Sequence, residues 1–216
     1  MPVLHAKPQV SQLRPRPTAF LLDPTAPARY REIEKCRICG NDELSPVLSL
    51  GEQFLTGVFP RGLHATLSRG PLELVACAAT ANAEACGLVQ LRQSYELSEL
   101  YGENYGYRSS LNASMVGHLK RKVHQLLKRH PLQSGDLVLD IGSNDGTLLS
   151  FYPEKDVTVV GIDPTGRKFA SYYPPHVALL PDFFSAGLFR ENFGSRKARI
   201  VTSISMFYDL EDPLSF

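Results

Sequence analysis

The stretch Val138-Leu139-Asp140-Ile141-Gly142-Ser143-Asn144-Asp145-Gly146 decides the fold. An apolar strand that begins at Leu137 enters a turn of small residues, and a helical stretch from Thr147 to Tyr152 follows it. Strand, tight turn and helix in this order are typical of the first unit of a nucleotide-binding α/β domain. Gly142 permits a ligand to approach the backbone closely, and Gly146 permits close packing of helix on strand.

The flanking sequence alternates between helix and strand patterns. Apolar residues at helical spacing predict a helix from Leu111 to Arg129, for which Ser109, Ser110 and Asn112 are candidate N-caps. The remaining pattern predicts strands at Val157–Ile162, Val177–Leu180 and Ala198–Ile204, a helix that ends before Pro174-Pro175, and a helix at Phe183–Phe193. Alternating elements with short connections predict an α/β fold with a parallel, doubly wound sheet. Because such sheets have about six strands, we expect an incomplete sheet in a partial chain.

Acidic residues stand at the ends of three successive predicted strands, at Asp140, Asp163 and Asp182. Asp163 can accept hydrogen bonds from both hydroxyls of a ribose, and Asp182 can bond an adenine amino group. Each acid taken alone is most simply a solvated loop-end or capping residue. Three acids at successive strand ends, however, indicate one ligand site.

Two cofactors compete for a loop of this kind. The dinucleotide fingerprint requires Gly-x-Gly-x-x-Gly, whereas here Asn144 takes the middle position and Thr147 the last. An acid just before the loop, Asp140, suits a cationic amino-acid ligand better than a pyrophosphate, and S-adenosylmethionine carries an ammonium and a sulfonium but no phosphate. We therefore predict that S-adenosylmethionine is the cofactor, with an NAD-dependent oxidoreductase as the less favoured alternative. The predicted cofactor-binding residues are Asp140, Gly142, Ser143, Asn144, Gly146, Asp163 and Asp182.

All four cysteines fall within one short part of the chain, at Cys36, Cys39, Cys77 and Cys86. The pattern is Cys-x2-Cys followed by Cys-x8-Cys, with a glycine directly after the second cysteine of each pair. Buried thiols would not explain this clustering, and a redox motif would need a βαβ context that Cys36 lacks. The pattern predicts a structural zinc site with all four positions filled by thiolates, and therefore no catalytic role for the metal.

Composition narrows the function classes. The net charge of +1 excludes a strong electrostatic field for nucleic acid or a membrane surface. A basic cluster within the helix predicted at Leu111–Arg129 is read as a solvated helix face. The first thirty residues have no apolar run long enough for a signal peptide or a membrane span. We expect a cytoplasmic protein with a small-molecule substrate.

Several motifs together resemble the sugar C-methyltransferases, over roughly residues 33–216. They are Cys36-Arg37-Ile38-Cys39-Gly40, Cys86-Gly87-Leu88-Val89-Gln90-Leu91, Asp140-Ile141-Gly142-Ser143-Asn144-Asp145-Gly146, Gly161-Ile162-Asp163-Pro164-Thr165-Gly166 and Met206-Phe207-Tyr208-Asp209-Leu210. The resemblance implies a Rossmann-like class I methyltransferase sheet preceded by a small zinc-binding domain. It also implies methyl transfer to C3 of a 4-keto deoxysugar linked to a nucleoside diphosphate, with Tyr107 and Tyr208 on the substrate side of the catalytic centre.

The texture of the sequence separates three regions: a Pro-rich N-terminal segment at 1–32, a region at 33–98 that holds all four cysteines, and a regular α/β region at 105–216. The resemblance implies that the second is a zinc-binding domain and the third the N-terminal portion of a methyltransferase domain. The family's His-Glu-His stretch and its C-terminal domain do not occur in these 216 residues. A non-catalytic fragment that acts as a zinc- and nucleotide-binding module is therefore the alternative to an enzyme.

Overall fold

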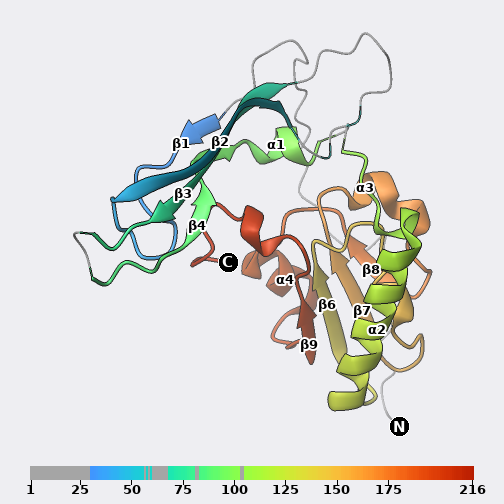
Figure 1. The fold of residues 1–216 in the computed structure, drawn as a ribbon. Helices are drawn as coiled ribbons and strands as arrows, with labels where there is room; N and C mark the ends of the chain where they lie inside the picture. The colour runs from blue at the N-terminus through green and yellow to red at the C-terminus, as the bar shows by residue number, and fades with distance from the viewer. Residues whose placement is uncertain (1–29, 56, 58, 60–67, 81–82, 103–104) are drawn as a thin grey trace. The chain divides into compact units, whose positions relative to one another are not determined.

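The computed structural model describes residues 30–216 except 56, 58, 60–67, 81–82 and 103–104. The Pro-rich segment predicted at 1–32 lies almost wholly outside the described residues. The chain forms two compact units (Figure 1). The sheet unit comprises Arg108–Tyr208, and the cysteine unit comprises the described residues up to Tyr107 together with Asp209–Phe216.

The sheet unit is built on four parallel strands, β6 (Leu137–Ile141), β7 (Thr158–Ile162), β8 (Val177–Leu180) and β9 (Ile200–Thr202). Their order is β8-β7-β6-β9 (Figure 1). From β6 the chain steps outward through β7 to β8, and it then returns to the other side of β6. The strand order thus reverses between β6 and β9, and ligands of open α/β sheets bind outside the carboxyl ends of the strands at such a point.

Helices cover both faces of this sheet. Helix α2 (Ala113–Arg129) buries Leu119 and Val123 against one face. Helix α4 (Ala186–Phe193) buries Leu188 and Phe193 against the other. Successive residues of β6 enter the two cores in turn, as a strand buried on both sides requires. The predicted α/β fold with a parallel sheet is confirmed.

Short helical turns connect these elements, and some differ from the prediction. They are η2 (Ser109–Leu111), η3 (Leu149–Phe151), α3 (Gly166–Phe169), η4 (Ala170–Tyr172) and η5 (Phe207–Asp209). The helical stretch predicted from Thr147 to Tyr152 is wrong in extent, since only the single turn η3 forms. Pro153 disfavours helical backbone at Tyr152, which is extended and ends the turn.

Helices α2 and α4 each begin later in the sequence than predicted, directly after a residue whose side chain caps the helix. Of the three candidate caps before α2, Asn112 is the N-cap, and its side chain accepts a hydrogen bond from the Ser114 N–H. The helix predicted at Phe183–Phe193 begins at Ala186, because Ser185 caps it through the Leu188 N–H.

The cysteine unit consists of short antiparallel sheets with little core. Strand β1 (Tyr30–Glu32) pairs with β5 (Gln93–Tyr95), and β2 (Leu44–Phe54), β3 (Arg69–Cys77) and β4 (Val89–Leu91) form a second sheet. One helical turn, α1 (Leu97–Leu100), follows. Among the described residues of this unit, the buried hydrophobic side chains are Ile33, Cys36, Val75 and Cys77. Such a core is too small to order a sheet without further cross-links.

No helix in the described parts of the chain has the length and apolar character needed to cross a membrane.

Candidate functional site

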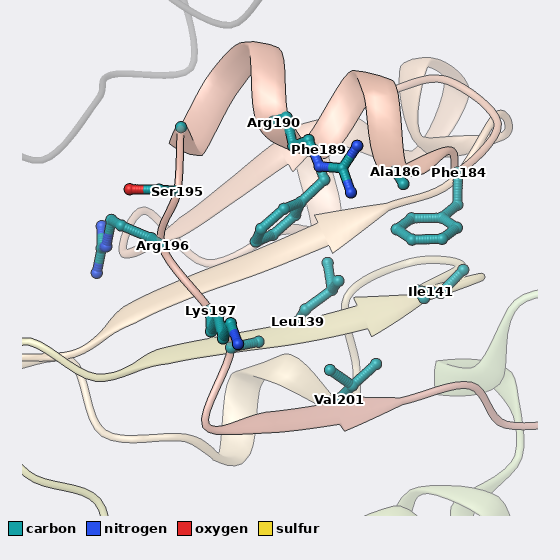
Figure 2. A pocket seen from close by; sticks show the side chains of 12 residues that line it. Leu139, Ile141, Phe184, Ala186, Phe189, Arg190, Ser195, Arg196, Lys197 and Val201 are labelled. Atoms are coloured by element: carbon teal, nitrogen blue, oxygen red, sulfur yellow. The ribbon is translucent and has the colours of Figure 1, made fainter.

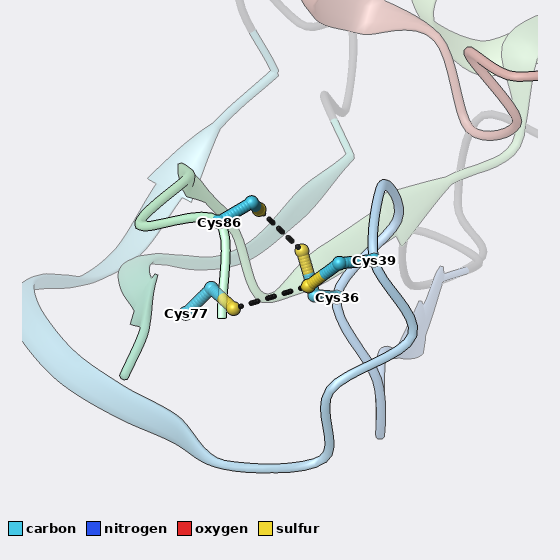
Figure 3. Close-up of side chains that lie close together, drawn as sticks. All are labelled: Cys36, Cys39, Cys77 and Cys86. Atoms are coloured by element: carbon cyan, nitrogen blue, oxygen red, sulfur yellow. Dashed lines mark hydrogen bonds between the residues drawn. The ribbon is translucent and has the colours of Figure 1, made fainter. Parts of the chain in front are cut away.

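The four cysteines predicted as metal ligands converge (Figure 3). Their Sγ atoms all lie within 4.8 Å of one another. Cys36 is 3.6 Å from Cys86, and Cys39 is 3.5 Å from Cys77, so each contact joins the first pair to the second. Four sulfurs placed about 2.3 Å from a central zinc would be roughly 3.8 Å apart. The cluster therefore has the size of a tetrahedral zinc site.

Backbone turns hold each cysteine pair in place. The Cys36 N–H donates to the Asn41 carbonyl, and the Cys77 N–H donates to the Leu88 carbonyl, so each pair closes a loop on itself. Gly40 and Gly87, which directly follow the second cysteines, have φ angles of +72° and +71°. Only glycine adopts this left-handed conformation without steric cost, which explains the glycine at both positions.

The surroundings favour the thiolate at two of the four sulfurs, Cys36 and Cys39. At Cys86, despite the Leu88 N–H, desolvation and the neighbouring sulfurs of Cys36 and Cys39 raise the pKa to about 11. Backbone N–H groups of Asn41 and Cys86 lower the pKa of Cys39 to about 6. Burial alone would raise the pKa of Cys36, but N–H groups of Cys39 and Ile38 and the side chain of Gln90 lower it below its usual value. Thiolates are the form that binds zinc, so this donor set fits the metal. Four protein ligands leave no open position, which limits a zinc ion here to a structural role.

The predicted acids lie at the carboxyl edge of the parallel sheet. Asp140 belongs to β6, Asp163 directly follows β7, and Asp182 lies two residues beyond β8. All three are buried, with exposed fractions of 4%, 6% and 6%. Asp140 and Asp163 are close enough to repel each other electrostatically. The Asp182 carboxylate accepts a hydrogen bond from the Phe183 N–H.

Asp140 lies at the strand-order reversal. Its Oδ1 accepts a hydrogen bond of 2.6 Å from the Thr202 hydroxyl of β9, so the two side chains bridge the strands between which the order reverses. Burial, together with the negative charge of Asp163, raises the pKa of Asp140 to about 7 although the Thr202 hydrogen bond opposes this. A buried carboxyl with a single donor among the described residues is placed to bind a cation.

Asp163 holds the loop that follows β6. Its Oδ2 accepts the backbone N–H of Asn144 at 2.8 Å, and its Oδ1 accepts the N–H and the hydroxyl of Thr165 at 2.7 and 2.5 Å. An ionised carboxylate offers about four acceptor positions. Three are used, so Asp163 has room for one ligand hydroxyl rather than the two expected from the sequence. Burial raises the pKa of Asp163 despite these donors.

The side chains of Asn144 and Asp145 form hydrogen bonds with groups outside the loop from Gly142 to Gly146. Asn144, at a φ of +53°, accepts the Ser109 N–H on its Oδ1, and Asp145 accepts the Ser110 N–H on its Oδ2. These contacts fix the segment before α2, so the Asn144 side chain is committed to that segment. Asp145 lies within the stretch from Val138 to Gly146 but was not among the predicted site residues. The sequence signal for Asp145 was its position two residues before Thr147. From there its Oδ1 accepts hydrogen bonds from the N–H and the hydroxyl of Thr147.

Tyr173 is a second residue that the sequence did not reveal. Its hydroxyl lies 2.8 Å from the Ser143 hydroxyl and donates to the Asn144 carbonyl at 2.8 Å. Its ring lies against Gly146, where an added Cβ would come within 2.9 Å of the ring. A side chain at position 146 would clash with the Tyr173 ring, so glycine is needed there. No local sequence pattern predicts a contact between residues so far apart in the chain. Gly142 likewise has a positive φ, of +75°.

A cavity of about 360 Å³ lies elsewhere on the sheet (Figure 2). Figure 2 shows Phe184 and Phe189 facing Leu139, Ile141 and Val201 across it. It lies on the side of the sheet that α4 covers, and the described residues that line it include none of the three acids. This cavity is therefore distinct from the site of the three acids.

The two predicted substrate-side tyrosines belong to different units. Tyr107 is the last residue of the cysteine unit before the sheet unit begins, and Tyr208 is the last residue of the sheet unit. Both side chains are exposed, Tyr208 more than Tyr107. Their predicted role stays a prediction.

Comparison with known proteins connects both sites to one family. Residues 36–101, which include all four cysteines, match Methyltransf_13, a family described as "Putative zinc binding domain". The chain is 31% identical over 186 residues to the C-methyltransferase NovU of Streptomyces niveus. That similarity covers 84% of this chain and 42% of the relative, so the chain spans less than half of the relative's length.

Metal analysis tests the cysteine cluster. Because four thiolates complete a tetrahedral site, purified protein should contain about one zinc per chain. Replacing one ligand, Cys77→Ser, should lower the zinc that survives dialysis, whereas Ser45→Ala on exposed β2 should leave it unchanged. Wild-type protein purified without chelator that contains no zinc would contradict the site.

Asp140→Asn tests the buried carboxyl through stability. Since the folded-state pKa of Asp140 is raised to about 7, the folded protein retains a proton that the unfolded chain loses near pH 4. The contribution of Asp140 to stability is thus favourable at low pH and is lost as pH rises toward 7 and above. The neutral, isosteric Asn residue removes this dependence.

Denaturant unfolding at pH 5 and pH 8 measures the difference. The free energy of unfolding of Asp140→Asn relative to wild type should be higher at pH 8 than at pH 5. The exposed Asp156→Asn serves as the control and should track the wild type at both pH values. Parallel pH profiles of wild type and Asp140→Asn would show that Asp140 is not held as described.

Proposed function

Because this chain belongs to the family of C-methyltransferases with an N-terminal zinc-binding domain, we propose that it binds S-adenosylmethionine and serves methyl transfer to a carbon atom. The observation that carries the proposal is the pair of buried carboxylates, Asp140 and Asp163, beside the strand-order reversal. Ligand sites of open α/β sheets form at this place.

The proposed cofactor site uses the carboxyl edge of the sheet. Asp140 faces the cationic methionine part, since a buried carboxyl gains most from a positive ligand. The one remaining acceptor position on Asp163 takes a ribose hydroxyl. Asp182 lies at the same edge and takes the adenine amino group. The backbone at Gly142, Ser143, Asn144 and Gly146 passes close to the ligand.

The loop geometry favours this cofactor over a dinucleotide. Asn144 occupies the position of the middle glycine of the dinucleotide fingerprint. Gly146 is followed by a single short turn, η3, rather than a long helix. A pyrophosphate needs the N-terminus of a regular helix, so this turn supports a ligand without phosphate. The buried acid before the loop also opposes a phosphate.

The domain division follows from the two sites. We assign residues 33–98 to a zinc-binding domain and residues 105–216 to the N-terminal portion of a Rossmann-like methyltransferase domain. A family match at 36–101 and four clustered thiols support the first assignment. A parallel sheet covered by helices on both faces supports the second.

The acceptor is proposed to be a nucleotide-activated keto-deoxysugar. S-adenosylmethionine supplies an electrophilic methyl group when bound. A base removes the proton from the carbon next to the ketone, that carbon forms the new C–C bond, and the S–CH₃ bond breaks to leave S-adenosylhomocysteine. Tyr107 and Tyr208 are assigned to the sugar side. The role of this chain's acids is to hold the donor in line with the acceptor carbon.

Titration calorimetry of the chain with S-adenosylmethionine and with NAD⁺ tests the cofactor. S-adenosylmethionine should bind more tightly, because it carries no phosphate, whereas NAD⁺ would bring an anionic pyrophosphate to the loop beside the buried Asp140. Asp163→Asn removes a charged acceptor and should weaken binding about tenfold or more. Asp156→Asn, an exposed acid of the same unit, should bind as the wild type does. Tighter binding of NAD⁺ would reject the proposal in favour of an oxidoreductase.

A further inference from the structure

Two buried side-chain amides flank the cysteine cluster. Asn41 lies two residues after Cys39, and Gln90 lies four residues after Cys86, so each follows one of the cysteine pairs. Their exposed fractions are 7% and 8%. A buried amide must place its N–H groups against acceptors, since an unsatisfied buried donor costs free energy.

Asn41 reaches from the first cysteine pair to the second. Its Nδ2 lies 3.4 Å from the Cys77 Sγ and donates to the Ala78 carbonyl at 2.9 Å and the Glu43 carbonyl at 3.2 Å. The two carbonyls fix the amide on the Cys77 side of the cluster. One N–H of Asn41 is thereby directed at a sulfur from the opposite pair.

Gln90 reaches in the reverse direction. Its Oε1 accepts the backbone N–H and the Nη1 of Arg37, each at 3.2 Å. Arg37 is in turn held by the Leu91 carbonyl and the Ser94 hydroxyl, both at 2.7 Å. Because Oε1 is fixed by Arg37, the orientation of the whole amide is fixed, and Nε2 must point away from Arg37.

The Gln90 Nε2 is the least favourably placed atom of the two amides. It is buried and has no hydrogen-bond partner of normal geometry. The Gln90 side chain nevertheless interacts with Cys36, where it favours the thiolate. A thiolate is a much better acceptor than a thiol, so metal binding at Cys36 would satisfy this donor.

We propose that Asn41 and Gln90 are positioning residues of the zinc site, each donating from one cysteine pair to a sulfur of the other. A zinc ion with four thiolates carries net negative charge, and N–H donors to sulfur offset that charge in a buried site. The two amides thus brace the pairs against each other and raise the affinity for the metal. This inference rests on the zinc site described above.

Variants without the donor test it. Gln90→Met keeps the size of the side chain and removes its N–H groups. Gln93→Met is the matched control, since Gln93 is also buried and accepts the Glu73 N–H of β3, and its hydrogen bonds among the described residues involve no cysteine. Competition with a chromogenic chelator measures zinc affinity, and the absorption bands of Co²⁺-loaded protein report on the sulfur–metal bonds.

Gln90→Met should bind zinc about 10- to 100-fold more weakly and shift the sulfur-to-cobalt band. Gln93→Met should keep both properties even where it lowers stability. Unchanged zinc affinity and an unchanged cobalt band in Gln90→Met would overturn the proposal. Wild type that binds no zinc would refute the site itself, which separates the two failures.

A measurement on unaltered protein covers a variant that does not fold. In wild type loaded with ¹¹³Cd²⁺, the side-chain amide protons of Asn41 and Gln90 should show scalar coupling to the metal through their N–H···S bonds. Amide protons of Gln93 should show none. Absence of coupling at Gln90 would overturn its assigned role.

Discussion

The hydrogen bond from the Asn144 N–H to the Asp163 carboxylate joins the two central strands at the point where they end. It holds Asn144 in a left-handed conformation and so shapes the loop between Gly142 and Gly146. From this loop, the side chains of Asn144 and Asp145 hold the segment that leads into α2. Tyr173 closes the loop from the other side. The loop is thus held by protein contacts in the form described.

The same constraint concentrates charge at one edge of the sheet. Strand β6 is buried along its whole length, so its one carboxyl, Asp140, is removed from water. A buried acid with one protein donor is costly for folding alone. Its place between β6 and β9 makes that cost understandable if a cationic ligand binds there. Asp140 is therefore the residue whose structural setting supports the proposed function most directly.

The sheet unit and the cysteine unit are stabilised in different ways. The sheet unit has two apolar cores, one on each face. The cysteine unit has few buried apolar side chains among its described residues, and β2 is almost fully exposed. Small domains of this kind depend on cross-links such as a metal ion, whose binding free energy contributes directly to folding. The cysteine cluster lies where such a link joins β3 to the turn after β1.

Sequence reasoning worked where a local pattern carried the information. The strand at β6, the Asn112 cap and the clustering of the four cysteines follow from periodicity, capping chemistry and spacing. It failed where a distant contact decided the outcome. Tyr173 imposed Gly146, and the Asn144 N–H used an acceptor position of Asp163 that the sequence had assigned to a ligand. These depend on residues brought together only by the fold.

Nuclear magnetic resonance of the backbone amides tests the central claim most directly. When S-adenosylmethionine is added to the zinc-loaded chain, signals of Gly142, Asn144, Asp163 and Thr202 should shift together and saturably. Signals of Phe189, Arg190 and Ser195, which line the cavity beside α4 away from β6 and β9, should not shift. Shifts confined to the α4 cavity, or none at the carboxyl edge of the sheet, would contradict the account.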